Sequence, residues 1–126
     1  MLKILLVDDS KTARARMSMM LKEFNIEYEI VGEAVDGMDA LTQFNALQPN
    51  LVITDLVMPN MDRMTLCNEI RKISIDTHII IISSTVNAQI KQAIQTDKYM
   101  QYIVKPVKES IVEHAITKIH QLFQVQ

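Results

Sequence analysis

Three carboxylates, a hydroxyl and an ammonium group stand after or at the ends of four short apolar segments of this chain. They are Asp8 and Asp9 after segment 2–7, Asp55 after 51–54, Ser83 at the end of 79–83, and Lys105 after 102–104. Two carboxylates about 5 Å apart repel each other by roughly 3 kcal/mol at an effective dielectric constant of 20, so three together favour a bound cation. Carboxylate oxygens suit Mg²⁺, which keeps positions open for phosphate oxygens. With a lysine to neutralise a transferred group, the set predicts a phosphoryl-transfer site.

These side chains meet only if the chain folds into alternating strands and helices. Apolar runs predict strands at 28–32 and at the four segments above, with the second strand followed only by Glu33 and Ala34. Helical spacing predicts five helices with these inward positions: Ala13, Met17, Met20, Leu21 and Phe24; Ala40, Leu41, Phe44 and Leu47; Leu66, Ile70 and Ile73; Val86, Ile90 and Ala93; Ile111, Ala115, Ile119 and Leu122. Ser10 or Asp9 is expected to cap the first helix, and Asp36 with Asp39 to open the second, which stops at Pro49.

Strands that alternate with helices predict an α/β fold with a parallel sheet and right-handed crossovers. Helices then cover both faces of an open, doubly wound sheet, which makes a three-layer sandwich. Ligands of such sheets bind at the carboxyl ends of the strands. The candidate residues named above fall at that edge, so we expect them to converge.

Composition restricts the remaining classes of function. The 126 residues suit one domain, expected to span 1–126, and a formal charge of −2 offers no basic surface for nucleic acid. One cysteine, no signal-peptide pattern and no apolar run of about 20 residues predict a cytoplasmic protein that does not cross a membrane. Two glycines in the whole chain exclude a glycine-rich nucleotide-binding loop.

The ordered motifs resemble those of a known family. They are Val7-Asp8-Asp9-Ser10, the stretch from Asp55 to Asp62 (DLVMPNMD), Ser83-Ser84, and Tyr102-Ile103-Val104-Lys105-Pro106. Over essentially its whole length the chain is similar to response-regulator receiver domains of bacterial two-component signalling, and among them to the stand-alone, CheY-like receivers of chemotaxis. The resemblance implies a flavodoxin-like, five-stranded sheet in the order 2-1-3-4-5.

The resemblance also implies a mechanism. Asp55 is then the phosphoacceptor for a sensor histidine kinase or histidine phosphotransfer protein. Its Mg²⁺ is held by the side chains of Asp9 and Asp55, by Asp8 through water and by the backbone carbonyl of Val57. Lys105 is expected to bind a phosphoryl oxygen, and the Lys105–Pro106 bond to be cis.

In such proteins the Ser83 hydroxyl turns toward the phosphoryl group and Tyr102 follows inward. This changes a face on the fourth helix, fifth strand and fifth helix that a downstream target protein reads. The chain is then not an enzyme, although it takes part in its own phosphorylation and slow autodephosphorylation. A monomer or a phosphorylation-dependent dimer fits this interpretation.

Two other functions stay open. A phosphorylation-independent adaptor with a degenerate switch is favoured by departures from the family at Arg63, where a glycine is usual, and at Lys98-Tyr99, beside the expected signalling face. A Mg²⁺-dependent aspartyl-phosphate phosphatase needs a second acid two residues after its nucleophile, where this chain has Val57. The three histidines, His78, His114 and His120, are assigned no chemistry. Cys67 is expected to be a small packed side chain. Val107 stands where the family often has Phe.

Overall fold

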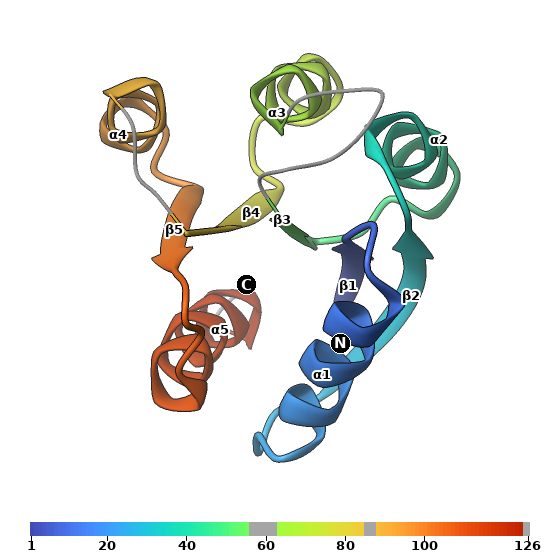
Figure 1. Ribbon diagram of the computed structural model, residues 1–126, viewed down its shortest axis with the longest axis vertical. Coiled ribbons are helices and arrows are strands. Elements are labelled where there is room, and N and C mark those ends of the chain that lie inside the picture. The colour runs from blue at the N-terminus through green and yellow to red at the C-terminus, as the bar shows by residue number, and fades with distance from the viewer. Residues whose placement is uncertain (56–62, 85–87, 125–126) are drawn as a thin grey trace.

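The computed structural model describes residues 1–55, 63–84 and 88–124. Within these ranges five strands and five helices alternate along the chain (Figure 1). The strands are β1 (Leu2–Val7), β2 (Tyr28–Ala34), β3 (Leu51–Asp55), β4 (His78–Ser83) and β5 (Met100–Val104). The helices are α1 (Lys11–Lys22), α2 (Gly37–Leu47), α3 (Arg63–Ile73), α4 (Ala88–Thr96) and α5 (Glu109–Gln124).

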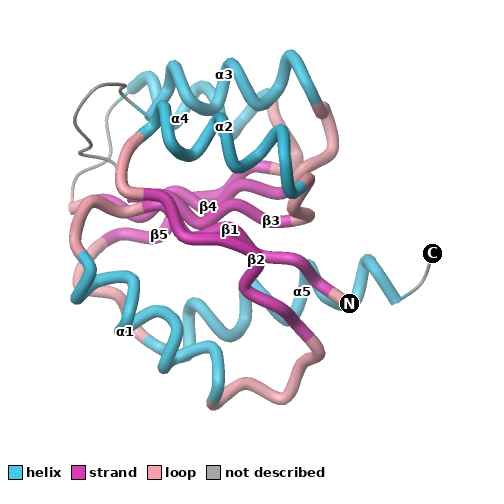
Figure 2. Tube along the Cα trace, turned by 90° about the vertical axis from the view of Figure 1, so that its right-hand side faces the viewer, coloured by secondary structure: helices cyan, strands magenta, loops and turns pink. Residues whose placement is uncertain are grey.

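The strands form one parallel sheet in the order β2-β1-β3-β4-β5. Figure 2 shows the three layers, with α1 and α5 on one face of the sheet and α2, α3 and α4 on the other. The predicted fold class and strand order are therefore confirmed. In the part of the chain described here, no helix is long and apolar enough to cross a membrane.

Burial on both faces explains why the central strands are almost wholly apolar. In β4, for example, Ile79 and Ile81 belong to the core under α2, α3 and α4, whereas Ile80 and Ile82 belong to the core under α1 and α5. The same alternation holds in β1 and β3, since successive side chains of a strand point to opposite faces. A polar residue at most positions of these strands would therefore enter one core or the other, whereas Lys3 near the start of β1 is exposed.

The second strand is longer than its sequence predicted. It continues through Glu33 to Ala34 instead of ending at Gly32, and its register against β1 shifts by one residue, since Ile4 lies opposite Ile30 but Leu5 lies opposite Gly32. This irregularity is a β-bulge, which adds one residue to one strand of a pair. A Cβ at Gly32 would lie against Gln43 Oε1 and 2.8 Å from Leu47 Cδ1, so these two side chains of α2 would have to shift to make room for it.

Three residues predicted to face the core are exposed, and that prediction was wrong for each. Ile73, Ile111 and Leu122 keep 50%, 48% and 50% of their surface in solvent. On α5 the buried stripe consists of Val112, Ala115, Ile116 and Ile119. The predicted stripe and the buried stripe share Ala115 and Ile119 and both have helical spacing. Packing against the sheet buries the side with Val112 and Ile116 and leaves Ile111 and Leu122 exposed. Val86, also predicted inward, lies outside the described residues.

The predicted helix caps hold. The Ser10 hydroxyl accepts a hydrogen bond from the Ala13 amide at 3.2 Å and so satisfies a free N–H at the start of α1. At the start of α2, Asp36 Oδ1 accepts from the Asp39 amide at 2.8 Å, and Asp39 Oδ2 accepts from the Val35 amide at 3.1 Å. These two reciprocal bonds fix where α2 leaves the sheet.

Candidate functional site

Four strands bring the predicted residues to one edge of the sheet. In register, Val7 at the end of β1 lies opposite Thr54, and Ser83 at the end of β4 lies opposite Val104. Asp55 is the last residue of β3, not the first of a loop as predicted. The Lys105 amide donates to the Ser83 carbonyl at 2.7 Å, which ties the chain after β5 to the end of β4.

An ion pair at this edge joins the predicted phosphoacceptor to the predicted lysine. Lys105 Nζ lies 2.7 Å from Asp55 Oδ2, and the two side chains are 42% and 13% exposed. The ion pair is therefore open to solvent on the lysine side and shielded on the carboxylate side. The Lys105–Pro106 bond is cis, as expected.

Asp8 carries a perturbed carboxyl group next to this pair. Burial first, and then the charge of Asp55, raise the pKa of Asp8 from 3.8 to about 6, against a hydrogen bond from the Ser10 amide that lowers it. Hydrogen bonds of the protonated form with Asp55 and Asp9 act in the same direction as burial. Burial, with the Asp55 charge added to it, makes the ionised form of Asp8 unfavourable here, and a nearby cation would favour that form.

The three carboxylates offer the ligand type that Mg²⁺ prefers. In residues 1–55, 63–84 and 88–124, no three His, Cys, Asp or Glu side chains form a group that could hold a metal ion. Mg²⁺ does not need such a closed cage, because it binds through one or two carboxylates and keeps several waters. The donor set of Asp8, Asp9 and Asp55 therefore fits this ion, while Val57 lies outside the described residues.

The two predicted switch residues lie on neighbouring strands beside the ion pair. Ser83 is 1% exposed at the end of β4, whereas Tyr102 on the edge strand β5 is 36% exposed. Tyr102 lies opposite Ile81, two residues before Ser83. Ser83 is thus buried at the carboxyl end of β4, whereas Tyr102 is partly exposed on the neighbouring edge strand β5.

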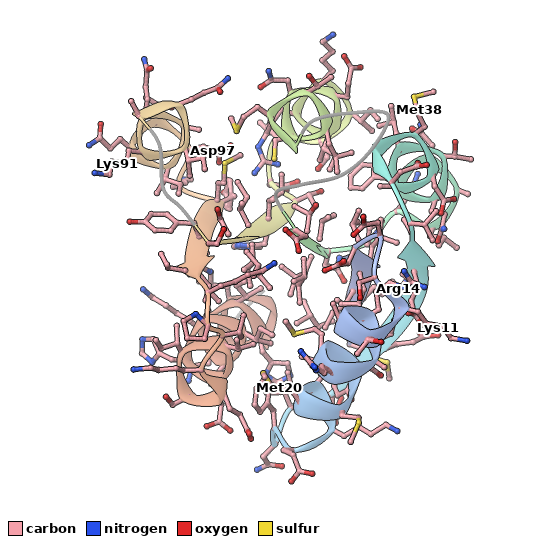
Figure 3. The ribbon with its side chains drawn as sticks, viewed as in Figure 1. Lys11, Arg14, Met20, Met38, Lys91 and Asp97 are labelled. Atoms are coloured by element: carbon pink, nitrogen blue, oxygen red, sulfur yellow. The ribbon has the colours of Figure 1, made fainter. Side chains whose placement is uncertain are left out.

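Sequence analysis gave no role to one residue of this edge, Arg14, which is not among the inward positions predicted for the first helix. Arg14 Nη1 donates to the Asp8 carbonyl at 2.6 Å, and Arg14 Nε pairs with Glu33 Oε1 at 3.0 Å. Figure 3 shows Arg14 between α1 and β2. Helical side chains lean toward the N-terminus of their helix, so an arginine one turn after the cap Ser10 was a usable signal.

A cavity of about 410 Å³ opens beside Asp55 and Lys105, between α1 and the chain after β5. Its floor is apolar and includes Met17, Ile53 and Val107. Val107 also packs against the core under α1 and α5, and Met20 lies on the side of α1 that faces α5 (Figure 3).

Lys98 and Tyr99, the two residues before Met100 that depart from the family, lie at the amino ends of β4 and β5. The rings of Tyr99 and His78 meet edge to face at 5.2 Å, and Lys98 Nζ lies 5.1 Å from the centre of the Tyr99 ring. Arg71 of α3 makes two bonds to Asp97, at 2.6 and 3.3 Å, and so holds the end of α4. Tyr99 therefore serves packing at this edge, away from Asp55.

The remaining side chains without assigned chemistry differ in exposure. His78 is 8% exposed, and burial first, then the charge of Arg71, lower its pKa. His114 is exposed, whereas His120 is half-buried and its Nε2 accepts from the Glu27 amide at 3.4 Å. Cys67 is buried in the core, as predicted.

Known proteins resemble this chain over nearly its whole length. The sequence pattern of the response regulator receiver domain matches residues 4–117. The chemotaxis protein CheY of Thermotoga maritima is 35% identical over 120 residues, which cover 93% of this chain and 96% of that protein. The solved structure of Vibrio cholerae CheY4 is 26% identical with a TM-score of 0.79, and the match covers 94% of this chain and 98% of that one.

A further structure, the CheX–CheY–BeF₃–Mg²⁺ complex of Borrelia burgdorferi, shows the same fold. It is 23% identical with a TM-score of 0.82, and the match covers 94% of this chain and 88% of that one. The chain belongs to the response regulator receiver domains of two-component systems, and within them it is CheY-like.

Proposed function

We propose that this chain is a phosphorylation-driven switch in which Asp55 accepts a phosphoryl group from a phosphohistidine. The observation that carries this proposal is the contact of 2.7 Å between Lys105 Nζ and Asp55 Oδ2. An Asp55 oxygen attacks phosphorus, the P–N bond breaks, and its electron pair goes to the imidazole nitrogen of the donor. The Lys105 ammonium then follows the charge from the carboxylate to a phosphoryl oxygen.

Asp9 and Asp55 would hold Mg²⁺ directly, with Asp8 acting through water and Val57 through its carbonyl. The ion, when bound, would screen charge on the phosphoryl oxygens and orient them. Asp8 supports this role because its pKa, raised to about 6 by burial and by Asp55, marks a place where positive charge is favourable. The Borrelia burgdorferi complex includes Mg²⁺ and BeF₃ with a protein of this fold.

The charge added to Asp55 would bias the loop after β4 through the Ser83 hydroxyl, with Tyr102 moving inward from its exposed position. Partners would then read a changed face on α4, β5 and α5. Burial of Ser83 beside the site and exposure of Tyr102 at the sheet edge support this sequence of events. We assign the chain to the cytoplasm, as one receiver domain over 1–126 that acts on a downstream target and loses its phosphoryl group slowly.

The retained ion pair favours the switch over an adaptor that has lost it. Beryllofluoride with Mg²⁺ is a phosphate mimic, so NMR spectra of the protein with and without it test the proposal. We expect amide shifts at Asp55, Ser83, Tyr102 and Lys105 that require Mg²⁺ and are lost in Asp55→Asn. Asp76→Asn, which removes an exposed carboxylate from the loop before β4, is the matched control and should respond as the wild type does. Spectra that do not change would contradict the proposal.

A further inference from the structure

Asp8 is held at three of its polar groups. Its amide donates to the Ala34 carbonyl at 3.0 Å, and its Oδ1 accepts from the Ser10 amide at 2.8 Å. Its own carbonyl accepts from Arg14 Nη1 at 2.6 Å. The first two bonds belong to the sheet and to the local turn, whereas the third comes from a long side chain of α1.

Arg14 is itself fixed at a second point. Its Nε lies 3.0 Å from Glu33 Oε1, and its side chain is 12% exposed whereas that of Glu33 is 49% exposed. A guanidinium group is planar, so bonds from Nε to one partner and from Nη1 to another determine both its position and its plane. The added residues of β2 matter here, because Glu33 reaches Arg14 only from a strand that continues to Ala34.

The Asp8 carbonyl is part of the peptide unit that joins Asp8 to Asp9. Such a unit is planar, so holding its oxygen also sets the direction of the Asp9 amide and the path on to Asp9. From this geometry we infer that Arg14 is a positioning residue for the divalent cation, with Glu33 as its support. Arg14 sets how the carboxylates of Asp8 and Asp9 are presented beside Asp55 and touches neither the ion nor the phosphoryl group.

This inference rests on the proposed function, since it assumes a cation at Asp8, Asp9 and Asp55. It differs from a purely electrostatic role for Arg14. A nearby positive charge alone would weaken cation binding, whereas a guanidinium group that fixes the Asp8–Asp9 peptide unit would strengthen it. The two roles therefore predict opposite changes in Mg²⁺ affinity when the guanidinium is removed.

Titration of the intact chain with Mg²⁺, followed by amide NMR shifts, separates these roles. Arg14→Met keeps the apolar stem and removes the donors, so we expect its dissociation constant for Mg²⁺ to rise about tenfold or more, as is usual for partners that orient metal ligands. Arg14→Lys keeps the charge but not the fork and should recover only part of the affinity. Arg16→Met is the matched control, because Arg16 is exposed on the same helix and also lines the cavity, and its affinity should equal that of the wild type.

Hydrogen exchange in the metal-free protein gives a second readout. If Arg14 holds the acidic peptide, exchange of the Asp9 and Ser10 amides should accelerate in Arg14→Met beyond any change in global stability, and not in Arg16→Met. Unchanged or tighter Mg²⁺ binding in Arg14→Met, with a wild type that binds, would overturn this inference alone. A wild type that does not bind Mg²⁺ would overturn the proposed function and with it the metal role of Arg14.

Discussion

Replacement of Asp8 by asparagine should stabilise the metal-free protein near neutral pH. The folded protein raises the pKa of Asp8 from 3.8 to about 6, mainly by burial and then by the charge of Asp55. At about 1.4 kcal/mol for each pH unit between these values, ionised Asp8 costs at most about 3 kcal/mol. Because the side chain is only half-buried, solvent screening reduces this cost, and we expect a gain of about 1 kcal/mol in Asp8→Asn.

The gain should depend on pH in a defined direction. The folded state binds more protons than the unfolded state between pH 3.8 and about 6, so the contribution of wild-type Asp8 is fully present below pH 3.8 and is lost as the pH rises through 6. Wild type and Asp8→Asn should therefore unfold alike near pH 3.8 and differ most above pH 6. Thermal unfolding without metal should show a difference of about 4 °C at the high end.

Added Mg²⁺ should reverse the ranking. A cation at 100 times its dissociation constant stabilises the folded state by about 2.7 kcal/mol, and the wild type should gain more of this than Asp8→Asn. Asp76→Asn is the control and should stay within about 0.5 kcal/mol of the wild type throughout. If Asp8→Asn is no more stable than the wild type at pH 7.5 without metal, ionised Asp8 does not carry the cost that burial and the charge of Asp55 are inferred to impose.

Three further predictions concern the frame of the site. Arg71→Met removes two bonds to Asp97 and leaves its half-buried carboxylate without that partner. Urea unfolding should therefore show that the free energy of unfolding falls by about 2 kcal/mol. An unchanged urea midpoint would contradict the role of this pair. The pKa of His78 is lowered, so its stabilising contribution is present above pH 6.5 and is lost as the pH falls. His78→Phe should therefore lose less stability than the wild type between pH 7 and 5. An equal loss in the two proteins would refute this. Gly32→Ala should cost about 1–3 kcal/mol in denaturant unfolding, because the new Cβ would displace Gln43 Oε1 and Leu47 Cδ1. A neutral effect would mean that these two side chains move aside freely.

Much of the fold could be predicted because the central strands are buried on both faces and so require apolar sequences. The four consecutive isoleucines of β4 suit a strand buried on both faces, and Asp8 and Asp55 mark where their strands reach the site. The edge strand β2 has no such signal, since it is half-exposed and its bulge arises from pairing with β1. Its end at Ala34 depends on contacts that no local pattern contains.

The facing of α5 and the role of Arg14 were missed for a related reason. Ile111 and Val112 are both apolar, so spacing alone allows two stripes, and only the packing of the helix on the sheet makes Val112 the buried one. Arg14 lies outside the predicted inward stripe of α1, where charged residues usually meet solvent. Its contact with Glu33 spans 19 positions of sequence and exists only once β2 lies beside β1.

The most direct test of the central claim is the mass of the intact protein after incubation with a small phosphodonor and Mg²⁺. We predict the addition of one phosphoryl group that requires Mg²⁺, maps to Asp55 and disappears in Asp55→Asn while persisting in Asp76→Asn. A phosphoryl group that still appears in Asp55→Asn, or no addition to the wild type, would contradict the assignment of Asp55 as the phosphoacceptor.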